Sequence, residues 1–498
     1  MARTSDREIA RIYIIGAGFA GRALAREIKD KAVFGSVVAF LDDDAAKIGA
    51  RIEGIPVLGP IKDVVNLLRR TPADEAIIAI PSASKEFLRE LYFLLKRAGF
   101  VRIRIVPGIA QIVEGDAHLI QAREIESQDL LGRSPIAIGL RESLAYLRGK
   151  RVLVTGAGGS IGSELSRQLL SAGAARLYLF GSGENSIYQI DRELRLLREE
   201  GVGERTSIVP LIGDLKDADY TRFILGRLKA DAVFHAAAYK HVPMMEENPI
   251  AAAHNNVLGT RNLVESALAA GVRRFVLIST DKAVEPVSIY GATKMIAERI
   301  VLDAMGRAAP GREFMVVRFG NVLGSRGSIV PLFRRQIEKG GPVTVTHPDA
   351  TRYFMTIPEA CSLVLKTGGV GRSGQTYLLD MGEPVRIRDL AEQMIRFYGY
   401  APGKDIRIEY IGLRPGERLE ERLFARDEVL VPTEHPRINR LERSGQAQLD
   451  AAALVADVEP HCVPTPGREK AYRNRKSLRK VLKSYVPTLV EPDREPEF

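Results

Sequence analysis

A tyrosine and a lysine, Tyr290 and Lys294, stand four residues apart in a segment of helical periodicity. In a helix these positions share a face, so the lysine ammonium can lower the pKa of the phenol and also hold the ribose of a nicotinamide. A phenolate beside a hydroxyl group is a base for oxidising an alcohol. Thr280 follows an apolar run earlier in the chain, and its hydroxyl would hydrogen-bond the substrate oxygen. These three residues predict hydride-transfer chemistry.

Asp281 and Lys282 directly follow Thr280 and decide which reaction such a site performs. Epimerisation at C4 of a sugar needs only the removal and return of hydride. Dehydration also needs a base for the C5 proton, which becomes acidic beside a C4 ketone, and an acid for the departing C6 hydroxyl. Lys282 in its neutral form would be that base, and Asp281 would be that acid. If the two residues instead form a surface ion pair, a 4-epimerase is the alternative.

Three glycines, Gly156, Gly159 and Gly162, follow the apolar run at residues 151–155. This is the spacing of short-chain dehydrogenases, in which the first glycine forms the turn, the second admits a pyrophosphate, and a helix N-terminus meets the phosphate charge. Such turns also occur for packing alone, but Asp214, after a later strand, would add a carboxylate at the adenine edge. The residues expected at the dinucleotide are Gly156, Gly159, Ser160, Ile161, Gly162, Asp214, Leu215, Ala236, Ala238, Tyr290 and Lys294.

The sequence leaves the kind of dinucleotide open. Residues 180–185 read Phe-Gly-Ser-Gly-Glu-Asn, so a glycine stands where an acid usually binds the adenosine ribose. Without that carboxylate there is less repulsion of a 2′-phosphate, although no arginine follows the strand to pair with one. Both NAD and NADP fit, and either would remain tightly bound because hydride is returned in every cycle.

The N-terminal part of the chain carries another glycine-rich turn, with Gly16, Gly18 and Gly21 after the apolar run at residues 11–15. Asp42 ends the next strand and lies 21 positions after Gly21. At this spacing an acid can accept hydrogen bonds from a ribose. The four residues predict a second nucleotide site that serves regulation or stability, while chemistry stays with the later glycine turn.

Both glycine turns open an alternation of short apolar runs and helical patterns. This alternation predicts an α/β fold with two Rossmann-like doubly wound parallel sheets. Beyond Gly320, Gly- and Pro-rich segments predict a smaller C-terminal substrate-binding lobe over the strand ends. The expected strands are residues 11–15, 37–41, 76–80 and 103–106 in the first unit, and 151–155, 177–180, 208–212, 232–235, 275–279 and 315–318 in the second.

The same patterns predict four parts along the chain: an N-terminal nucleotide-binding module at residues 1–107, a linker at 108–149, a catalytic domain with its substrate lobe at 150–430, and a C-terminal extension at 431–498.

The 498 residues are 45% hydrophobic and 27% charged, which suits several globular domains. No apolar run approaches the ~18 residues that span a membrane. The polar N-terminus lacks a secretory signal, so a cytoplasmic protein is expected. Two cysteines predict neither a disulfide framework nor a metal site.

The net charge of +10 is concentrated near the C-terminus. Between Arg468 and Lys483, eight Lys or Arg residues stand against one acid, Glu469. A solvated helix face accounts for such a run, and the alternative is peripheral contact with an anionic membrane surface. A nucleic-acid partner is not expected.

From about residue 151 to residue 430 the chain resembles the CapD-type polysaccharide-biosynthesis family of UDP-N-acetylglucosamine 4,6-dehydratases, which are extended short-chain dehydrogenases. The resemblance implies a UDP-linked hexose such as UDP-N-acetylglucosamine as substrate, a UDP-4-keto-6-deoxy sugar for capsule, exopolysaccharide or glycan synthesis as product, and a homo-oligomer. Its motifs are Gly-Ala-Gly-Gly-Ser-Ile-Gly-Ser-Glu at 156–164, Ala-Ala-Ala-Tyr-Lys-His-Val-Pro at 236–243, Ser-Thr-Asp-Lys-Ala at 279–283, Arg-Phe-Gly-Asn-Val-Leu-Gly-Ser-Arg-Gly-Ser at 318–328, Thr-His-Pro at 346–348, Thr-Arg-Tyr-Phe-Met-Thr at 351–356 and Arg-Pro-Gly-Glu at 414–417.

The resemblance also implies residues that hold the UDP-sugar. A guanidinium suits a diphosphate because its fork can bind two oxygens, and structural ion pairing is the alternative role for the charged residues. The implied set is Lys240, His241, Asn321, Arg326, Arg352 and Glu417.

Residues 1–107 resemble the nucleotide-binding domain of long family members, whose membrane helices are missing here, so the chain resembles a soluble or truncated long form. Long members commonly have Met where this chain has Tyr290, which leaves the stereochemical outcome at C5 open. A nucleotide-sensing regulator with an inactive catalytic unit is a further alternative. The intact residues of the site, Thr280, Asp281, Lys282, Tyr290 and Lys294, argue against it.

Overall fold

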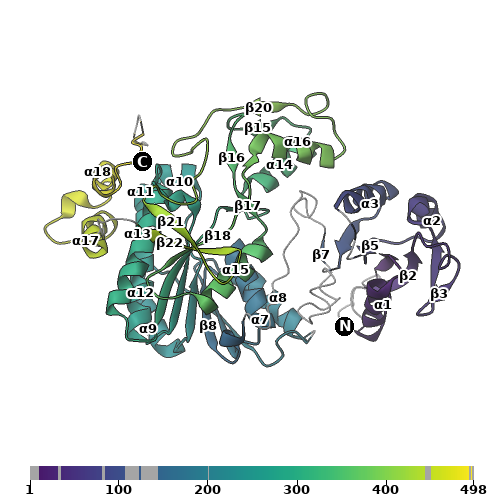
Figure 1. Cartoon of the computed structure of the whole chain (residues 1–498), viewed down its shortest axis with the longest axis horizontal. Helices are drawn as coiled ribbons and strands as arrows, with labels where there is room; N and C mark the ends of the chain where they lie inside the picture. Colours follow the sequence, from purple (N-terminus) through teal and green to yellow (C-terminus); the bar gives the residue numbers. More distant parts are fainter. Residues whose placement is uncertain are drawn as a thin grey trace, which may run out of the picture. The chain divides into compact units, whose positions relative to one another are not determined.

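The apolar runs predicted as strands form the centres of two large sheets in the computed structural model (Figure 1). The structure describes residues 10–31, 35–80, 83, 85–106, 123–124, 144–199, 201–443, 450–492 and 495. It divides into two units, Met1–Gly139 and Leu140–Phe498. Most of the expected linker at residues 108–149 lies outside the described residues.

The first unit is a Rossmann-like sheet with a core on each face. In β1 (Arg11–Ile15), Ile12 and Ile14 pack into one core while Tyr13 and Ile15 pack into the other. A parallel strand buried on both faces is apolar throughout, which is why its sequence shows no alternation. The strand order is β3-β4-β2-β1-β5-β6-β7. The other elements are β2 (Ser36–Leu41), β3 (Arg51–Ile52), β4 (Ile55–Gly59), β5 (Glu75–Ile78), β6 (Arg102–Ile105), β7 (Arg123–Glu124), α1 (Phe19–Lys31), α2 (Val64–Arg70) and α3 (Lys85–Ala98).

The second unit contains a nine-stranded sheet in the order β10-β9-β8-β11-β12-β13-β18-β22-β21. The seven strands from β10 to β18 are parallel, and β22 and β21 complete the sheet in antiparallel pairing. The order reverses between β8 and β11, where doubly wound sheets bind ligands at the carboxyl ends of their strands. The strands are β8 (Arg151–Thr155), β9 (Arg176–Gly181), β10 (Ser207–Ile212), β11 (Ala232–His235), β12 (Arg274–Ile278), β13 (Glu313–Arg318), β18 (Thr376–Leu379), β21 (Glu428–Pro432) and β22 (Ile438–Arg443). The doubly wound prediction is therefore confirmed.

Helices cover both faces of this sheet (Figure 1). On one face lie α7 (Ser160–Ser171), α8 (Glu184–Glu199) and α15 (Ile357–Val370). On the other face lie α9 (Ala218–Leu228), α12 (Gly259–Ala269) and α13 (Ile289–Ala304). The short helices α10 (Val242–Glu247) and α11 (Pro249–Ala252) and the π-helix η4 (Ala253–Leu258) connect β11 to α12.

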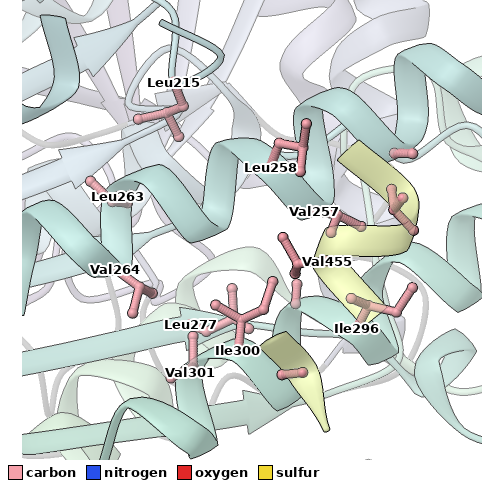
Figure 2. Close-up of a cluster of buried hydrophobic side chains, with 14 of the residues drawn as sticks. Leu215, Val257, Leu258, Leu263, Val264, Leu277, Ile296, Ile300, Val301 and Val455 are labelled. Atoms are coloured by element: carbon pink, nitrogen blue, oxygen red, sulfur yellow. The ribbon is translucent and has the colours of Figure 1, made fainter. Parts of the chain in front are cut away.

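The C-terminal residues belong to the second unit and contribute to its core. β21 crosses the expected domain boundary at residue 430, and β22 pairs with β18 inside the main sheet. Beyond them, α17 (Ala451–Cys462) and α18 (Arg475–Tyr485) pack against the helices of one face. Figure 2 shows Val455 of α17 among Val257, Ile296 and Ile300. The structure therefore has no break at residue 430, because strand pairing and shared apolar packing join the two sides.

The C-terminal basic segment forms an amphipathic helix together with the turn before it. Leu478 and Leu482 of α18 are fully buried, whereas Lys476 and Lys480 are exposed. Arg479 is also buried, and its guanidinium lies 2.9 Å from Glu246 Oε2. Arg479 thus has a structural role, and contact of the exposed basic residues with an anionic membrane stays a prediction.

A smaller lobe contains the remaining two-stranded sheets and two helices (Figure 1). It places β16, which carries Arg352, near the segment that follows β20. The expected substrate-binding position of this lobe stays a prediction. No helix in the described ranges combines the length and apolar character needed to cross a membrane. The lobe consists of β14 (Asn321–Val322), β15 (Val343–Val345), β16 (Thr351–Arg352), β17 (Phe354–Met355), β19 (Val385–Arg386), β20 (Ile408–Tyr410), α14 (Ile329–Glu338) and α16 (Ile387–Phe397).

Candidate active site

The glycine turn after β8 has the close backbone packing that a dinucleotide site requires. Gly156 has a φ of +67°, and a Cβ there would lie 2.7 Å from the backbone nitrogen of Ala237. A Cβ at Gly162 would lie 2.1 Å from the Gly156 carbonyl oxygen, so only glycine allows α7 to start so close to the strand. Gly159 is the N-cap of α7, whose first amides can meet a phosphate. The residues present therefore fit the pyrophosphate of NAD or NADP.

The other cofactor-binding candidates follow neighbouring strands of the same sheet. Asp214 and Leu215 follow β10, and Ala236 and Ala238 follow β11, so all of them lie at carboxyl ends of parallel strands. Asp214 forms an ion pair with Lys216 at 3.1 Å. The sequence analysis did not single out this lysine.

Thr280, Tyr290 and Lys294 come together between β12 and α13. Tyr290 is 7% exposed, and its phenol interacts with the Thr280 side chain. The Lys294 ammonium donates a hydrogen bond to the Ile278 carbonyl oxygen at 2.8 Å. The Thr280 hydroxyl donates a hydrogen bond to Asp281 Oδ1 at 2.9 Å. The residue expected to bind the substrate oxygen is therefore in contact with the expected acid, Asp281.

Burial shifts the pKa values of Tyr290 and Lys294. Burial raises the pKa of Tyr290 to about 12, and the charge that opposes burial is that of Lys282. Burial lowers the pKa of Lys294 to about 8, and Glu298, one helical turn further on, opposes the shift. Desolvation of the phenol outweighs the nearby positive charge of Lys282, and a contribution of Lys294 that lowers the Tyr290 pKa stays a prediction.

Asp281 and Lys282 form a hydrogen-bonded pair inside the site instead of a surface pair. Both residues belong to the 3₁₀ turn η5 (Asp281–Ala283), and Lys282 Nζ lies 3.0 Å from Asp281 Oδ1. The Asp281 side chain is fully buried, and its Oδ2 accepts no hydrogen bond from the described residues. A Cβ at Gly320 would lie 3.1 Å from this Oδ2. A buried carboxylate oxygen without a donor is a group that a substrate hydroxyl could satisfy.

Lys282 is held in its charged form in this arrangement. Burial by itself would lower the pKa of its ammonium, but the charges of Asp281 and then Glu421 outweigh burial and raise that pKa. The sequence-based mechanism needs a neutral Lys282, so the proton of this lysine must first move to a neighbour.

Asn321 is the substrate-binding candidate that the structure brings to this centre. Its Oδ1 accepts a hydrogen bond from Lys282 Nζ at 3.2 Å, and its Nδ2 donates to the Tyr353 carbonyl oxygen at 3.3 Å. Arg352 also approaches, since its Nε lies 3.9 Å from Glu421 Oε1. The other nitrogens of Arg352 donate to the carbonyl oxygens of Thr351, Arg418 and Leu419. Arg352 therefore joins β16 to the 414–421 segment.

Glu417, the last residue of the Arg-Pro-Gly-Glu motif, pairs with Arg414 of the same motif. The distance between Glu417 Oε1 and Arg414 Nη2 is 2.6 Å. This is the structural ion pairing that the sequence analysis named as the alternative role for Glu417. A direct contact of Glu417 with the UDP-sugar stays a prediction.

The loop at residues 323–328 contains Arg326 and lies next to Lys240 and His241. Arg326 donates to the Gly158 carbonyl oxygen at 3.0 Å, and its backbone amide donates to Ser160 Oγ at 3.0 Å. The structure thus places Arg326 on the glycine turn of the expected cofactor site. On the other side of the loop, Lys240 Nζ lies 3.4 Å from Ser325 Oγ, and a Cβ at Gly327 would lie 2.4 Å from a ring carbon of His241.

The N-terminal unit arranges its predicted site residues at one place. Gly16 has a φ of +102°, and a Cβ at Gly21 would lie 1.9 Å from the Gly16 carbonyl oxygen, whereas the space at Gly18 is open. Asp42 Oδ2 accepts the Ala17 amide hydrogen at 2.7 Å and lies 3.2 Å from Lys47 Nζ. Burial by itself would raise the pKa of Asp42, but hydrogen bonds from the Asp44 and Ala17 amides and from Lys47 lower it. The carboxylate is therefore charged and fixed against the glycine turn.

Metal ligation has no structural support in the described part of the chain. No group of three or more His, Cys, Asp or Glu residues there could hold a metal ion. Cys361 and Cys462 are both buried as free thiols.

The fold and the site together define an extended short-chain dehydrogenase/reductase of the nucleotide-sugar dehydratase and epimerase type. Residues 152–443 match a family model described as polysaccharide biosynthesis protein, and residues 2–107 match one described as CoA-binding domain. The chain belongs to the polysaccharide biosynthesis protein family, as the CapD-type resemblance predicted.

Known proteins that resemble the chain differ in the reaction their names describe. The chain is 42% identical to the capsular polysaccharide biosynthesis protein CapD of Staphylococcus aureus over 447 residues, covering 89% of this chain and 74% of CapD. A UDP-N-acetylglucosamine 4,6-dehydratase (inverting) of Campylobacter jejuni is 31% identical over 282 residues, covering 56% of this chain and 79% of the dehydratase. A UDP-glucose 4-epimerase of Rickettsia typhi is 30% identical over 289 residues, covering 56% of this chain and 79% of the epimerase.

Proposed function

We propose that this protein is a nucleotide-sugar 4,6-dehydratase that converts UDP-N-acetylglucosamine, or a close UDP-hexose, to a UDP-4-keto-6-deoxy sugar. The observation that carries the proposal is the buried contact between Asp281 and Lys282 beside Thr280. Dehydration needs an acid and a base next to the oxidising groups, and epimerisation does not. Similarity to the Campylobacter dehydratase supports this choice, whereas similarity to the Rickettsia protein makes the 4-epimerase the second candidate.

The first step of the proposed reaction is the oxidation of the sugar C4 hydroxyl. A bound NAD or NADP would supply the chemistry by accepting hydride from C4 and returning it to C6. Tyr290 would take the hydroxyl proton, and Thr280 would orient the C4 oxygen by a hydrogen bond. Lys294 of α13 reaches the Ile278 carbonyl at the end of β12, and its ammonium would hold the nicotinamide ribose there.

The second step is the elimination of water. A proton passes from the Lys282 ammonium to the Asp281 carboxylate along their 3.0 Å contact, which produces a neutral amine and a carboxylic acid. Lys282 then removes the C5 proton, and Asp281 gives its proton to the departing C6 hydroxyl. The starting ion pair is restored, and water is released. Return of the hydride to C6 and addition of a proton to C5, balanced by loss of the proton that Tyr290 took up, would complete the 4-keto-6-deoxy product.

The reaction is tested by incubating the purified protein with UDP-N-acetylglucosamine and measuring the product mass. We expect a product that is lighter than the substrate by one water. A product of unchanged mass with altered C4 configuration would instead identify an epimerase. No conversion at all would favour the nucleotide-sensing regulator.

The cofactor is expected to stay bound during purification, because an internal redox cycle gains nothing from its release. Denaturing the purified protein and analysing the supernatant by mass spectrometry should release a nicotinamide dinucleotide, and its mass distinguishes NAD from NADP. A supernatant without nicotinamide would contradict tight binding.

A second nucleotide without nicotinamide would identify the ligand of the site around Gly16, Gly18, Gly21 and Asp42. The CoA-binding description of the family model that matches residues 2–107 supports a nucleotide-containing ligand there. A homo-oligomer and a cytoplasmic location stay predictions.

A further inference from the structure

Glu421 is a carboxylate of the catalytic centre that the sequence motifs did not reveal. It lies just after the Arg-Pro-Gly-Glu motif, far along the chain from Lys282, and its side chain is 5% exposed. Its Oε1 lies 3.8 Å from Lys282 Nζ and 3.9 Å from Arg352 Nε. Both distances are those of ion pairs and are longer than a hydrogen bond. Glu421 is therefore a nearly buried carboxylate that lies between two cations of the site.

The Lys282 ammonium therefore has two carboxylates as neighbours. Asp281 is in direct contact at 3.0 Å, and Glu421 is the more distant partner. Arg352 is the positive group that balances Glu421 within the site. Other charged or titratable groups also act on this cluster: Tyr290 from α13, Lys240 from the segment after β11, Tyr353 between β16 and β17, and Arg418 from the same segment as Glu421.

We propose that Glu421 is a positioning residue for the elimination step, whose carboxylate shares the Lys282 ammonium with Asp281 and thereby governs the transfer of the Lys282 proton to Asp281. The role of Glu421 in catalysis rests on the proposed dehydratase function. The contact between Glu421 and Lys282 does not, because it needs no substrate.

The charge of Glu421 determines how strongly Lys282 keeps its proton. Two negative neighbours favour the ammonium form, so the amine is formed only when the proton moves to Asp281. Burial raises the pKa of Glu421, and the charge of Lys282 opposes that shift. If Glu421 takes up a proton, one negative neighbour disappears and Lys282 releases its own proton more readily. The net reaction is unchanged, because Glu421 neither gains nor loses a proton over the cycle.

The proposal is tested with Glu421→Gln, which keeps the shape of the side chain and removes its charge. The pKa of Lys282 can be measured in the whole protein without substrate, by trace acetylation with acetic anhydride at a series of pH values and mass spectrometry of the Lys282 peptide. We expect the Lys282 pKa to fall by about one unit or more in the variant, since removing a near charge commonly shifts a pKa by ~1–3 units. Glu421→Asp, which keeps the charge, should remain closer to the parent.

Glu420→Gln is the matched control, because Glu420 is the exposed neighbour and the same charge is removed one residue away. An unchanged Lys282 pKa in Glu421→Gln, or an equal fall in both glutamine variants, would overturn the proposal. In the dehydration assay the acidic limb of the pH profile should move to lower pH in Glu421→Gln only. A parent protein that does not dehydrate the UDP-sugar refutes the proposed function, while the acetylation result still decides the role of Glu421.

Discussion

Replacing Lys282 with Met should abolish the release of water from UDP-N-acetylglucosamine while hydride transfer from C4 continues. Loss of a positioned base costs a factor of ~100–10,000 in rate, which is far above assay error. The 4-keto hexose should then accumulate before C6 is reduced. The mass of the sugar product reports water loss, and the absorbance of reduced nicotinamide in a single turnover reports the oxidation that precedes it.

The methionine variant also removes the counter-charge of the fully buried Asp281, so its folding must be checked separately. Lys282→Arg is the second variant, because it keeps a positive charge but its guanidinium does not act as a base near neutral pH. We expect the same loss of dehydration in a folded protein. Lys339→Met, at an exposed lysine after α14, is the matched control and should behave as the parent. Dehydration at the parental rate in both Lys282 variants would show that Lys282 is not the base of the elimination.

Replacing Tyr290 with Phe should impair the earlier oxidation step. The Tyr290 ring extends from α13 into the buried core. Because the substitution removes only the hydroxyl, the fold should be retained. The rate of hydride transfer should fall by a factor of ~100–10,000. Because burial raises the pKa of Tyr290 to about 12, the phenolate fraction in the parent grows as the pH rises, and its oxidation rate should rise in parallel. The Phe variant should lose this dependence on pH.

The control for this substitution is Tyr188→Phe, which removes the same hydroxyl from a side chain that is 56% exposed. The two variants should block different steps: the reaction of Lys282→Met should stop after oxidation of C4, and the reaction of Tyr290→Phe should stop before it. If Tyr290→Phe reduces water loss without slowing hydride transfer, Tyr290 acts in the elimination instead of the oxidation.

The sequence was sufficient to predict the parts of the fold that depend on local patterns. Continuous apolar runs predicted the parallel strands, because strands buried on both faces have no polar side. Glycine spacing predicted the turn after β8, because close backbone contacts at Gly156 and Gly162 exclude any side chain. Motifs that follow successive strands were brought together because the carboxyl ends of parallel strands share one edge of the sheet.

Other features depend on contacts between residues that are far apart in the sequence, and only the tertiary structure decided them. β22 enters the main sheet by antiparallel pairing with β18, a pairing between residues more than fifty positions apart that no local pattern encodes. Arg326 lies on the glycine turn through hydrogen bonds to Gly158 and Ser160, which are distant in sequence.

The chemistry of the candidate site divides in the same way. Residue types and spacing predicted Asp281, Lys282 and Tyr290, since each follows a strand or shares a helix face. Their charge states were decided by burial and by neighbours from other segments: Lys282 keeps its proton because Asp281 and Glu421 are both near, and the phenol of Tyr290 is desolvated by the core. A pKa depends on the distances between charges and on exclusion from water, which a linear sequence does not specify.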